Sequence, residues 1–174
     1  CQIAHRPLHK KACKKRAAEL HEEALFKEHP PEECPICFLP FQLGSGQLTF
    51  KSCCGKHICA GCIHKMEEEA HGRGKIDLCA FCRKPAPTSE EEDINRIIKL
   101  MEADNANAFY QLGGYYAQGI IGMPQDWAKA NELLLKAGEL GCHQAYCNLG
   151  NSYDDGRGVE VDKKKAKYFY ELAA

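Results

Sequence analysis

Closely spaced cysteine pairs constrain this chain more than any other feature. Of its twelve cysteines, eight lie within residues 34–82. They form three spaced pairs and one adjacent pair: Cys34 and Cys37, Cys53 and Cys54, Cys59 and Cys62, and Cys79 and Cys82. Two cysteines separated by two residues can bind one tetrahedral ion at about 2.3 Å, and Zn²⁺ prefers thiolate and imidazole ligands. The spacing therefore predicts a metal-binding module over residues 34–84.

This window contains few apolar side chains for its length. Ile36, Phe38, Leu39, Ile58 and Phe81 are among those expected to form its small core. Domains of this size usually need a further source of stability. A structural zinc contributes about 10–16 kcal/mol of folding free energy. Because eight good ligands close two sites completely, we expect two structural Zn²⁺ ions and no catalytic one.

The identity of two of the eight expected metal ligands is left open by the spacing. The three spaced pairs supply six clear ligands, and the other two come from Cys53, Cys54 and His57. Four pairs can be joined into two sites in three ways, and spacing alone does not choose among them.

The cysteines are expected to be reduced. Residues 1–33 contain no apolar run of the 7–15 residues that a secretory signal needs, so we expect an intracellular protein, cytoplasmic or nuclear, in which thiols serve as metal ligands.

The chain begins at Cys1 and ends at Ala174 inside an expected helix, which suggests a fragment. No apolar run approaches the roughly 18 residues of a membrane span. The net charge of −1 argues against a strongly basic nucleic-acid binder.

The segments around the window are expected to be helical. Residues 1–33 predict a charged N-terminal helix over about 10–28, with basic residues from Lys10 onward and a stop at Pro30. Residues 85–88 predict a short linker. Ser89 with Glu92 then forms a capping-box pattern, and apolar residues follow at helical spacing.

The C-terminal part is a repeat. Ala108–Gly113 matches Ala145–Gly150 at a shift of 37 residues, and Asp126 matches Asp162 at a shift of 36. Each unit predicts a first helix, a glycine loop, an aspartate N-cap and a second helix. Residues 89–174 thus predict two units plus a leading helix. The fold class expected for the chain is mostly α: a small α+β two-zinc module followed by an all-α helical-repeat solenoid.

In the first helices of these units, three positions are glycines: Gly113, Gly114 and Gly150. Glycine costs about 1 kcal/mol relative to alanine in an exposed helix. We therefore expect these glycines to let the second helix approach closely.

The cysteine window resembles a RING finger. The run from Cys54 to Cys59 is similar to the all-cysteine RING variants, which favours Cys53 and Cys54 as ligands over His57. The resemblance implies an interleaved cross-brace of two zinc sites. It also implies a ubiquitin ligase that positions a ubiquitin-charged conjugating enzyme without a covalent intermediate, and therefore without a catalytic residue of its own.

The resemblance further implies three contacts to the conjugating enzyme and ubiquitin. Ile36 matches the apolar contact of the first loop, Ala80 stands where the family often has proline, and Arg83 matches a cation that hydrogen-bonds both partners. Residues 108–174 resemble Sel-1-like repeats, relatives of the tetratricopeptide repeat, which implies recruitment of a substrate or scaffold protein. The alternative is a non-catalytic zinc-binding interaction scaffold, which is favoured by Ala80 and by the lack of a tryptophan in the central RING helix.

Overall fold

The computed structural model describes residues 33–41, 48–71 and 78–174. The helix expected over residues 10–28, with its basic cluster, lies outside this described part.

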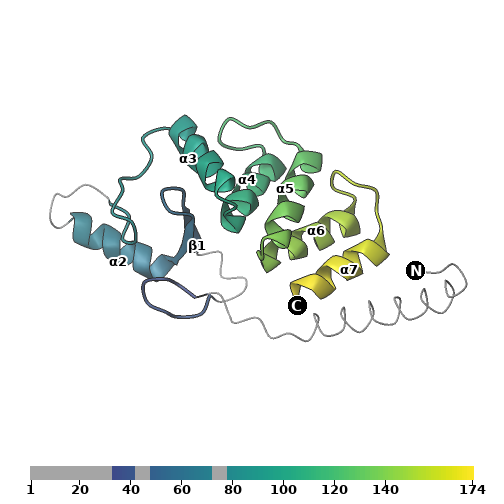
Figure 1. Ribbon diagram of the computed structural model, residues 1–174, viewed down its shortest axis with the longest axis horizontal. Helices are drawn as coiled ribbons and strands as arrows, with labels where there is room; N and C mark the ends of the chain where they lie inside the picture. The colour runs from purple at the N-terminus through teal and green to yellow at the C-terminus, as the bar shows by residue number, and fades with distance from the viewer. Residues whose placement is uncertain (1–32, 42–47, 72–77) are drawn as a thin grey trace, which may run out of the picture. The chain divides into compact units, whose positions relative to one another are not determined.

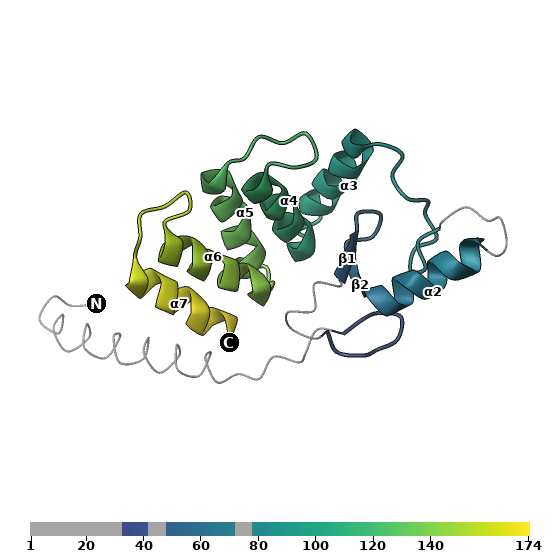
Figure 2. The same cartoon turned by 180° about the vertical axis from the view of Figure 1, so that it is seen from behind.

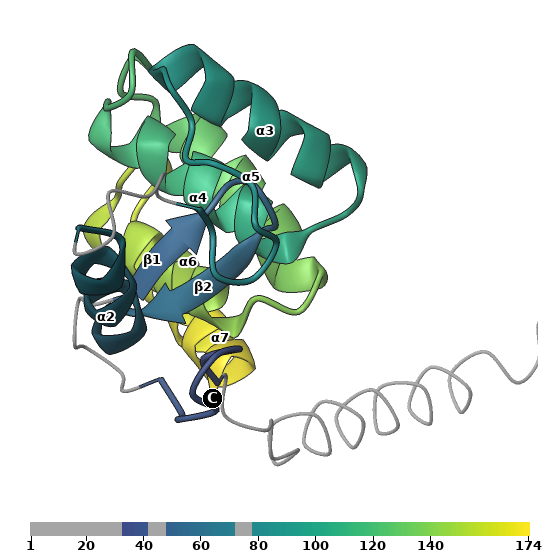
Figure 3. The same ribbon diagram turned by 90° about the vertical axis from the view of Figure 1, so that its left-hand side faces the viewer.

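The cysteine window contains a β-hairpin followed at once by a helix. Strands β1 (Leu48–Lys51) and β2 (Lys56–Cys59) pair antiparallel, with Leu48 opposite Cys59, and α2 spans Ala60–His71 (Figure 3). The turn between the strands is closed by hydrogen bonds from the backbone N–H groups of Cys54 and Gly55 to the Lys51 carbonyl, at 3.1 and 2.8 Å. Ile58 on β2 is fully buried. The hairpin and α2 therefore form a small α+β unit.

Five helices follow in succession: α3 (Glu90–Glu102), α4 (Ala106–Gln118), α5 (Trp127–Glu139), α6 (His143–Asp155) and α7 (Lys163–Ala173) (Figure 1). α4 packs against α5, and α6 against α7. The loops that join the two helices of each pair lie on the same side of the stack (Figure 2). This is the all-α repeat domain predicted from the sequence. In the described part of the chain, no helix is long and apolar enough to cross a membrane.

Both repeats use the predicted start and stop signals. Asp126 and Asp162 each accept a hydrogen bond from the backbone N–H three residues further on, at 2.9 and 3.1 Å. Gly119 and Gly156 end α4 and α6 in the left-handed conformation, with φ of 67° and 75°, which favours glycine because it has no Cβ.

The predicted capping box of α3 is present in a shifted form. The Ser89 hydroxyl accepts a hydrogen bond from the Glu92 N–H at 3.1 Å, as expected. The Glu92 carboxylate, however, accepts from the N–H and hydroxyl of Thr88, both at 2.8 Å, and pairs with Arg96 at 2.6 Å. The Thr88 N–H, its hydroxyl and Arg96 lower the pKa of Glu92 to about 2.

Two apolar clusters hold the helices together. One is centred on Leu134, Ala145 and Leu149, between α5, α6 and α7. The other is centred on Ile97, Ala108 and Leu112, between α3 and α4. The small alanines at the cluster centres let the helices pack closely, and burial of the larger side chains supplies the main stabilisation.

The helix glycines do not all have the expected role. A Cβ placed on Gly150 would overlap the Tyr170 ring, and one on Gly113 would lie 3.3 Å from the Ala130 carbonyl oxygen. Gly114 has nothing within 4 Å of such a Cβ. The expectation of a close helix approach is therefore right for Gly113 and Gly150 and wrong for Gly114, which lies on another face of α4.

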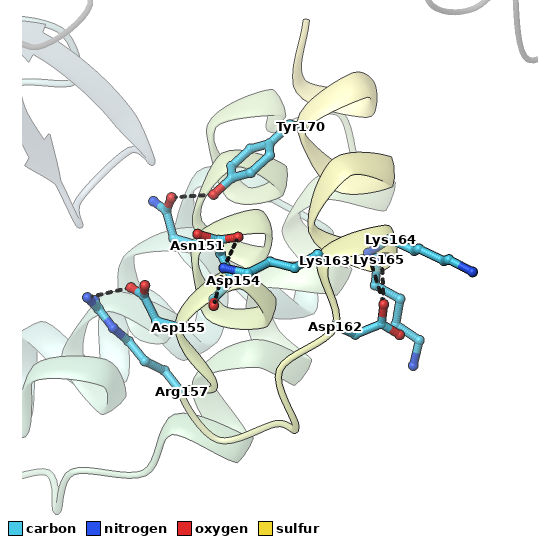
Figure 4. Close-up of polar contacts among 9 residues, drawn as sticks. All are labelled: Asn151, Asp154, Asp155, Arg157, Asp162, Lys163, Lys164, Lys165 and Tyr170. Carbon is cyan, nitrogen blue, oxygen red and sulfur yellow. Dashed lines mark hydrogen bonds and ion pairs between the residues drawn. The ribbon is translucent and has the colours of Figure 1, made fainter.

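Exposed polar contacts link α6 to α7 (Figure 4). Lys163 Nζ lies 2.8 Å from the Asp154 carboxylate, and the Tyr170 hydroxyl donates to Asn151 Oδ1 at 2.8 Å. Surface pairs of this kind contribute about 0–1 kcal/mol each. The apolar cluster therefore does more to hold the two helices together.

Candidate metal centre

Two of the cysteine pairs lie in turns of the same geometry. Phe38 donates its N–H to the Cys34 carbonyl at 2.9 Å, and Arg83 donates to the Cys79 carbonyl at 2.8 Å. Phe38 and Arg83, each directly after the second cysteine of its pair, have φ of 57° and 62°. We call these turns the first knuckle (residues 34–38) and the second knuckle (residues 79–83). Left-handed backbone is uncommon for such side chains, and its recurrence shows that both turns are built alike.

The other two pairs lie on the hairpin unit. Cys53 and Cys54 are in the turn between β1 and β2. Cys59 ends β2, and Cys62 lies in the first turn of α2. The strand-to-helix junction therefore sets the separation of the Cys59/Cys62 pair.

The fold gathers the eight sulfurs into two groups of four. The first group is Cys34, Cys37, Cys59 and Cys62, and the second is Cys53, Cys54, Cys79 and Cys82. Within each group all sulfur atoms lie within 4.8 Å of one another. Taken in chain order, the first pair joins the third and the second joins the fourth. The arrangement is thus the interleaved one among the three pairings that the spacing allowed.

The spacing of the sulfurs fits a tetrahedral ion. The Cys37 and Cys59 sulfurs are 3.7 Å apart, and those of Cys54 and Cys79 are 3.9 Å apart. Four sulfurs at about 2.3 Å from a central zinc lie about 3.8 Å from one another. A disulfide needs about 2.05 Å, and none of the ten cysteines of the described residues forms one. Each group can therefore hold one metal ion.

Proton affinity differs sharply within each group. Burial acts to raise the pKa of Cys34, but the backbone N–H groups of Cys59 and Cys37, among others, outweigh it and lower that pKa to about 6. In the same group, burial and hydrogen bonds with neighbouring sulfurs raise the pKa of Cys62 to about 12. Adjacent thiolates repel one another, so one sulfur ionises readily while its neighbour keeps a proton. A divalent cation removes this repulsion, because a coordinating thiol loses its proton.

The second group shows the same division. Burial acts to raise the pKa of Cys79, but backbone N–H groups of the second knuckle lower it to about 7. Burial raises the pKa of Cys54 to about 11 and also raises that of Cys53. Both groups therefore contain a sulfur that N–H groups stabilise as a thiolate.

His57 does not belong to either group. It lies on β2 opposite Phe50, and the two rings are 5.5 Å apart. The sulfurs of Cys53 and Cys54 occupy the positions for which His57 was the alternative.

The residues expected to contact partners lie on the knuckles. Ile36 and Ala80 are half-buried, each between the two cysteines of its knuckle, and Arg83 is exposed. Because Arg83 follows the last cysteine directly, the second knuckle fixes its backbone.

Sequence reasoning missed the exposure of several apolar side chains of the cysteine window, above all those at the knuckles. Phe38, Leu39 and Phe81, expected in the core, are 71%, 65% and 50% exposed. The Phe81 ring lies near a cation, with Lys56 Nζ 5.7 Å from its centroid. Both knuckles thus present apolar surface to solvent. The sequence signal that could have shown this is a bulky apolar residue directly beside a knuckle cysteine, because the knuckle fixes the backbone of that residue.

Comparison with known proteins places the repeats in a family. Residues 106–142 and 143–174 each match the family model described as Sel1 repeat. The boundaries agree with the helix pairs α4–α5 and α6–α7. Residues 106–174 thus match the Sel1 repeat model twice, and the cysteine window lies outside the match.

Two solved structures are similar to this chain. A Sel1 repeat protein from Oxalobacter formigenes has 30% identity and a TM-score of 0.45, over 48% of this chain and 34% of its own. The protein c5321, a protective antigen of uropathogenic Escherichia coli with an SLR fold, has 26% identity and a TM-score of 0.47, over 64% of this chain and 25% of its own. The chain thus spans about a third and a quarter of these two proteins.

Proposed function

We propose that residues 34–84 bind two structural Zn²⁺ ions in a cross-brace. The first ion is held by Cys34, Cys37, Cys59 and Cys62, and the second by Cys53, Cys54, Cys79 and Cys82. The support is the tetrahedral spacing of the sulfurs, 3.7 Å for Cys37 and Cys59 and 3.9 Å for Cys54 and Cys79. When bound, the ions supply rigidity and close their coordination shells with four sulfurs each. Thiolate ligands need a reducing environment, so the proposal includes an intracellular location.

The function that this site supports best is that of a RING-type ubiquitin ligase. The resemblance of the cysteine spacing to RING fingers suggests it, and the interleaved sulfur groups are the single observation that carries it. The knuckles would present Ile36, Ala80 and Arg83 to a conjugating enzyme charged with ubiquitin. Catalysis of this kind is positioning: a bound, oriented thioester reacts faster with a substrate lysine. The chain itself needs no nucleophile or general base.

The exposed apolar side chains give the knuckles a means of docking. Phe38 and Leu39 extend from the first knuckle, and Phe81 lies within the second. Exposed apolar side chains next to a cation such as Arg83 are typical of a protein interface. They would supply apolar contacts of the kind that RING fingers often obtain from a proline at the position of Ala80.

The Sel1 repeats are proposed to recruit the substrate or a scaffold protein. Solenoids of stacked helix pairs present extended surfaces to partner proteins. The chain would thus join a conjugating-enzyme site to a substrate-binding surface.

A self-ubiquitination assay tests the ligase proposal. The chain is incubated with ubiquitin, its activating enzyme and a panel of conjugating enzymes, with and without a zinc chelator. Arg83→Asn removes the cation but keeps a residue that tolerates positive φ, and Lys84→Asn removes the neighbouring cation as the matched control. We expect chelation, Ile36→Ala and Arg83→Asn to abolish activity and Lys84→Asn to preserve it. Full activity of both Ile36→Ala and Arg83→Asn would refute the mechanism.

A zinc-binding scaffold without ligase activity is the second candidate. Ala80 favours it, because alanine is a smaller and less rigid contact than the proline often found there in RING fingers. In a binding screen, a chain that holds two zinc ions but binds no conjugating enzyme would support this candidate and exclude the ligase.

A further inference from the structure

Helix α3, which precedes the two repeats, aligns in sequence with α5, the second helix of the first repeat. Its N-cap Ser89 precedes Asp126, the N-cap of α5, by 37 residues, and both helices are 13 residues long. Ile97 of α3 is fully buried, and Leu134, at the equivalent position of α5, is 3% exposed. α3 thus continues the repeat pattern one step toward the N-terminus.

Within the described residues, no first helix fills the corresponding position ahead of α3, since α2 ends at His71. In the register of α4 (Ala106–Gln118), a first helix ahead of α3 would span about residues 69–81. Residues 79–83 form the second knuckle instead. The terminal unit of a solenoid needs a cover for the apolar face that a neighbouring repeat would otherwise bury.

The β-hairpin provides part of that cover. Phe50 of β1 is half-buried and packs against the apolar cluster of Ile97, Ala108 and Leu112. This contact brings a strand residue against the face that helix pairs bury elsewhere in the stack.

The hairpin turn also contacts the start of α4. Asn107 Nδ2 donates to the Gly55 carbonyl oxygen at 3.3 Å. A Cβ on Gly55 would lie only 2.9 Å from Asn105 Cγ. Asn105 cannot move away freely, because its Oδ1 caps α4 by accepting the Ala108 N–H at 3.0 Å. Gly55 is thus buried against Asn105, the side chain that caps α4.

The same turn carries two sulfurs of the second group. Cys53 and Cys54 precede Gly55 directly, and the Lys51 carbonyl accepts hydrogen bonds from the N–H groups of Cys54 and Gly55. A metal ion that joins Cys53 and Cys54 to the second knuckle would fix the position of Gly55, because Gly55 follows Cys54 directly in the backbone.

We propose that this turn is a metal-dependent cap of the repeat stack. Filling the second sulfur group holds Gly55 on the start of α4 and stabilises α3 and α4. The inference rests on the zinc binding proposed above, and it adds that the metal supports the repeats as well as the cysteine window.

Hydrogen exchange on the full 174-residue chain tests the cap. Metal content is measured alongside, for zinc-loaded and chelator-treated protein. We expect amides 108–112 of α4 to exchange at least about tenfold faster after zinc removal, while amides in α6 and α7 change much less. A factor of ten corresponds to about 1.4 kcal/mol. If zinc leaves and α4 keeps its protection, the cap is refuted while zinc binding stands. Absence of zinc in the untreated protein refutes both.

A pair of glycine variants tests the contact itself. Gly55→Ala should speed exchange at the start of α4 about tenfold in protein that still holds two zinc ions. Gly122→Ala is the matched control, because Gly122 shares the left-handed backbone of Gly55 (φ of 67° and 68°) while a Cβ there would come no nearer than 4.0 Å to a neighbouring atom, and it should change exchange at the start of α4 much less. Asn105→Ser shortens the opposing side chain but keeps a capping hydroxyl, so it should restore much of the protection lost in Gly55→Ala.

The absence of that restoration, or an equal effect of both glycine variants, would overturn the proposed contact. If Gly55→Ala does not fold, Asn107→Ala carries the test. It removes only the 3.3 Å hydrogen bond to Gly55 and should speed exchange of the same amides, whereas unchanged exchange would count against the cap.

Discussion

The sulfurs of Cys37 and Cys59 lie 3.7 Å apart although 22 residues separate them in sequence. This contact joins the first knuckle to the end of β2, and the contact of Cys54 with Cys79 at 3.9 Å joins the hairpin turn to the second knuckle. Each sulfur group therefore closes a loop of the chain. Because closing loops costs entropy, we expect the proposed metal binding to have a large effect on the folding of this window.

Gly138 supports the packing of α5 on α6. A Cβ there would overlap the Tyr146 ring, which stacks on Phe169 with centroids 6.0 Å apart. We expect Gly138→Ala to lower the free energy of unfolding by about 1–3 kcal/mol, because the ring has to shift in a packed interface. Urea unfolding at neutral pH measures this change.

Gly114→Ala is the matched control for that variant. Its Cβ would meet nothing within 4 Å, so helix propensity alone acts and should raise stability by up to about 1 kcal/mol. Effects of the same sign in both variants would contradict this account of repeat packing.

The Glu92 carboxylate predicts a pH-dependent stabilisation of α3. Its pKa falls from 4.5 to about 2 in the folded chain, chiefly because the Thr88 N–H and hydroxyl donate to it. A lowered folded-state pKa means that its stabilising contribution is complete above about pH 4.5 and is lost as pH falls toward 2. The difference in Tm between the wild-type chain and Glu92→Gln should therefore shrink over this range. A difference that stays constant from pH 7 to 2.5 would exclude this role.

The Asp126 cap is expected to stabilise the first repeat. Its Oδ1 accepts the Lys129 N–H at 2.9 Å. Asp126→Ala should cost about 1 kcal/mol, whereas Asp126→Asn keeps an acceptor oxygen and should cost much less. Chemical denaturation compares the two variants. Equal losses would indicate that charge or solvation, rather than the capping hydrogen bond, sets the stability at this position.

The repeats were largely predictable because their signals are local. Helix ends are marked by Asp126, by Gly119 and by the equivalent residues of the second repeat, through hydrogen bonds that span only a few residues of sequence. Such signals are visible in any stretch of chain. The distinction between Gly113 and Gly114 was not visible, because it depends on which face of α4 the neighbouring helix covers.

In the cysteine window the local pairs were visible in the spacing, whereas the way in which they join into two groups was expected only from the resemblance to RING fingers. Two-residue spacing shows which cysteines act together, whereas joining Cys37 to Cys59 is a long-range contact that no local signal specifies. The exposure of Phe38 was missed for a similar reason. Hydrophobicity predicts burial where a helix or strand gives a periodic face, and a knuckle gives none.

Native mass spectrometry of the purified 174-residue chain tests the central claim most directly. The account predicts a folded species whose mass exceeds that of the polypeptide by two zinc ions, one for each group of four sulfurs. A chain that stays equally folded, with its narrow charge-state distribution intact, while carrying no metal would contradict it.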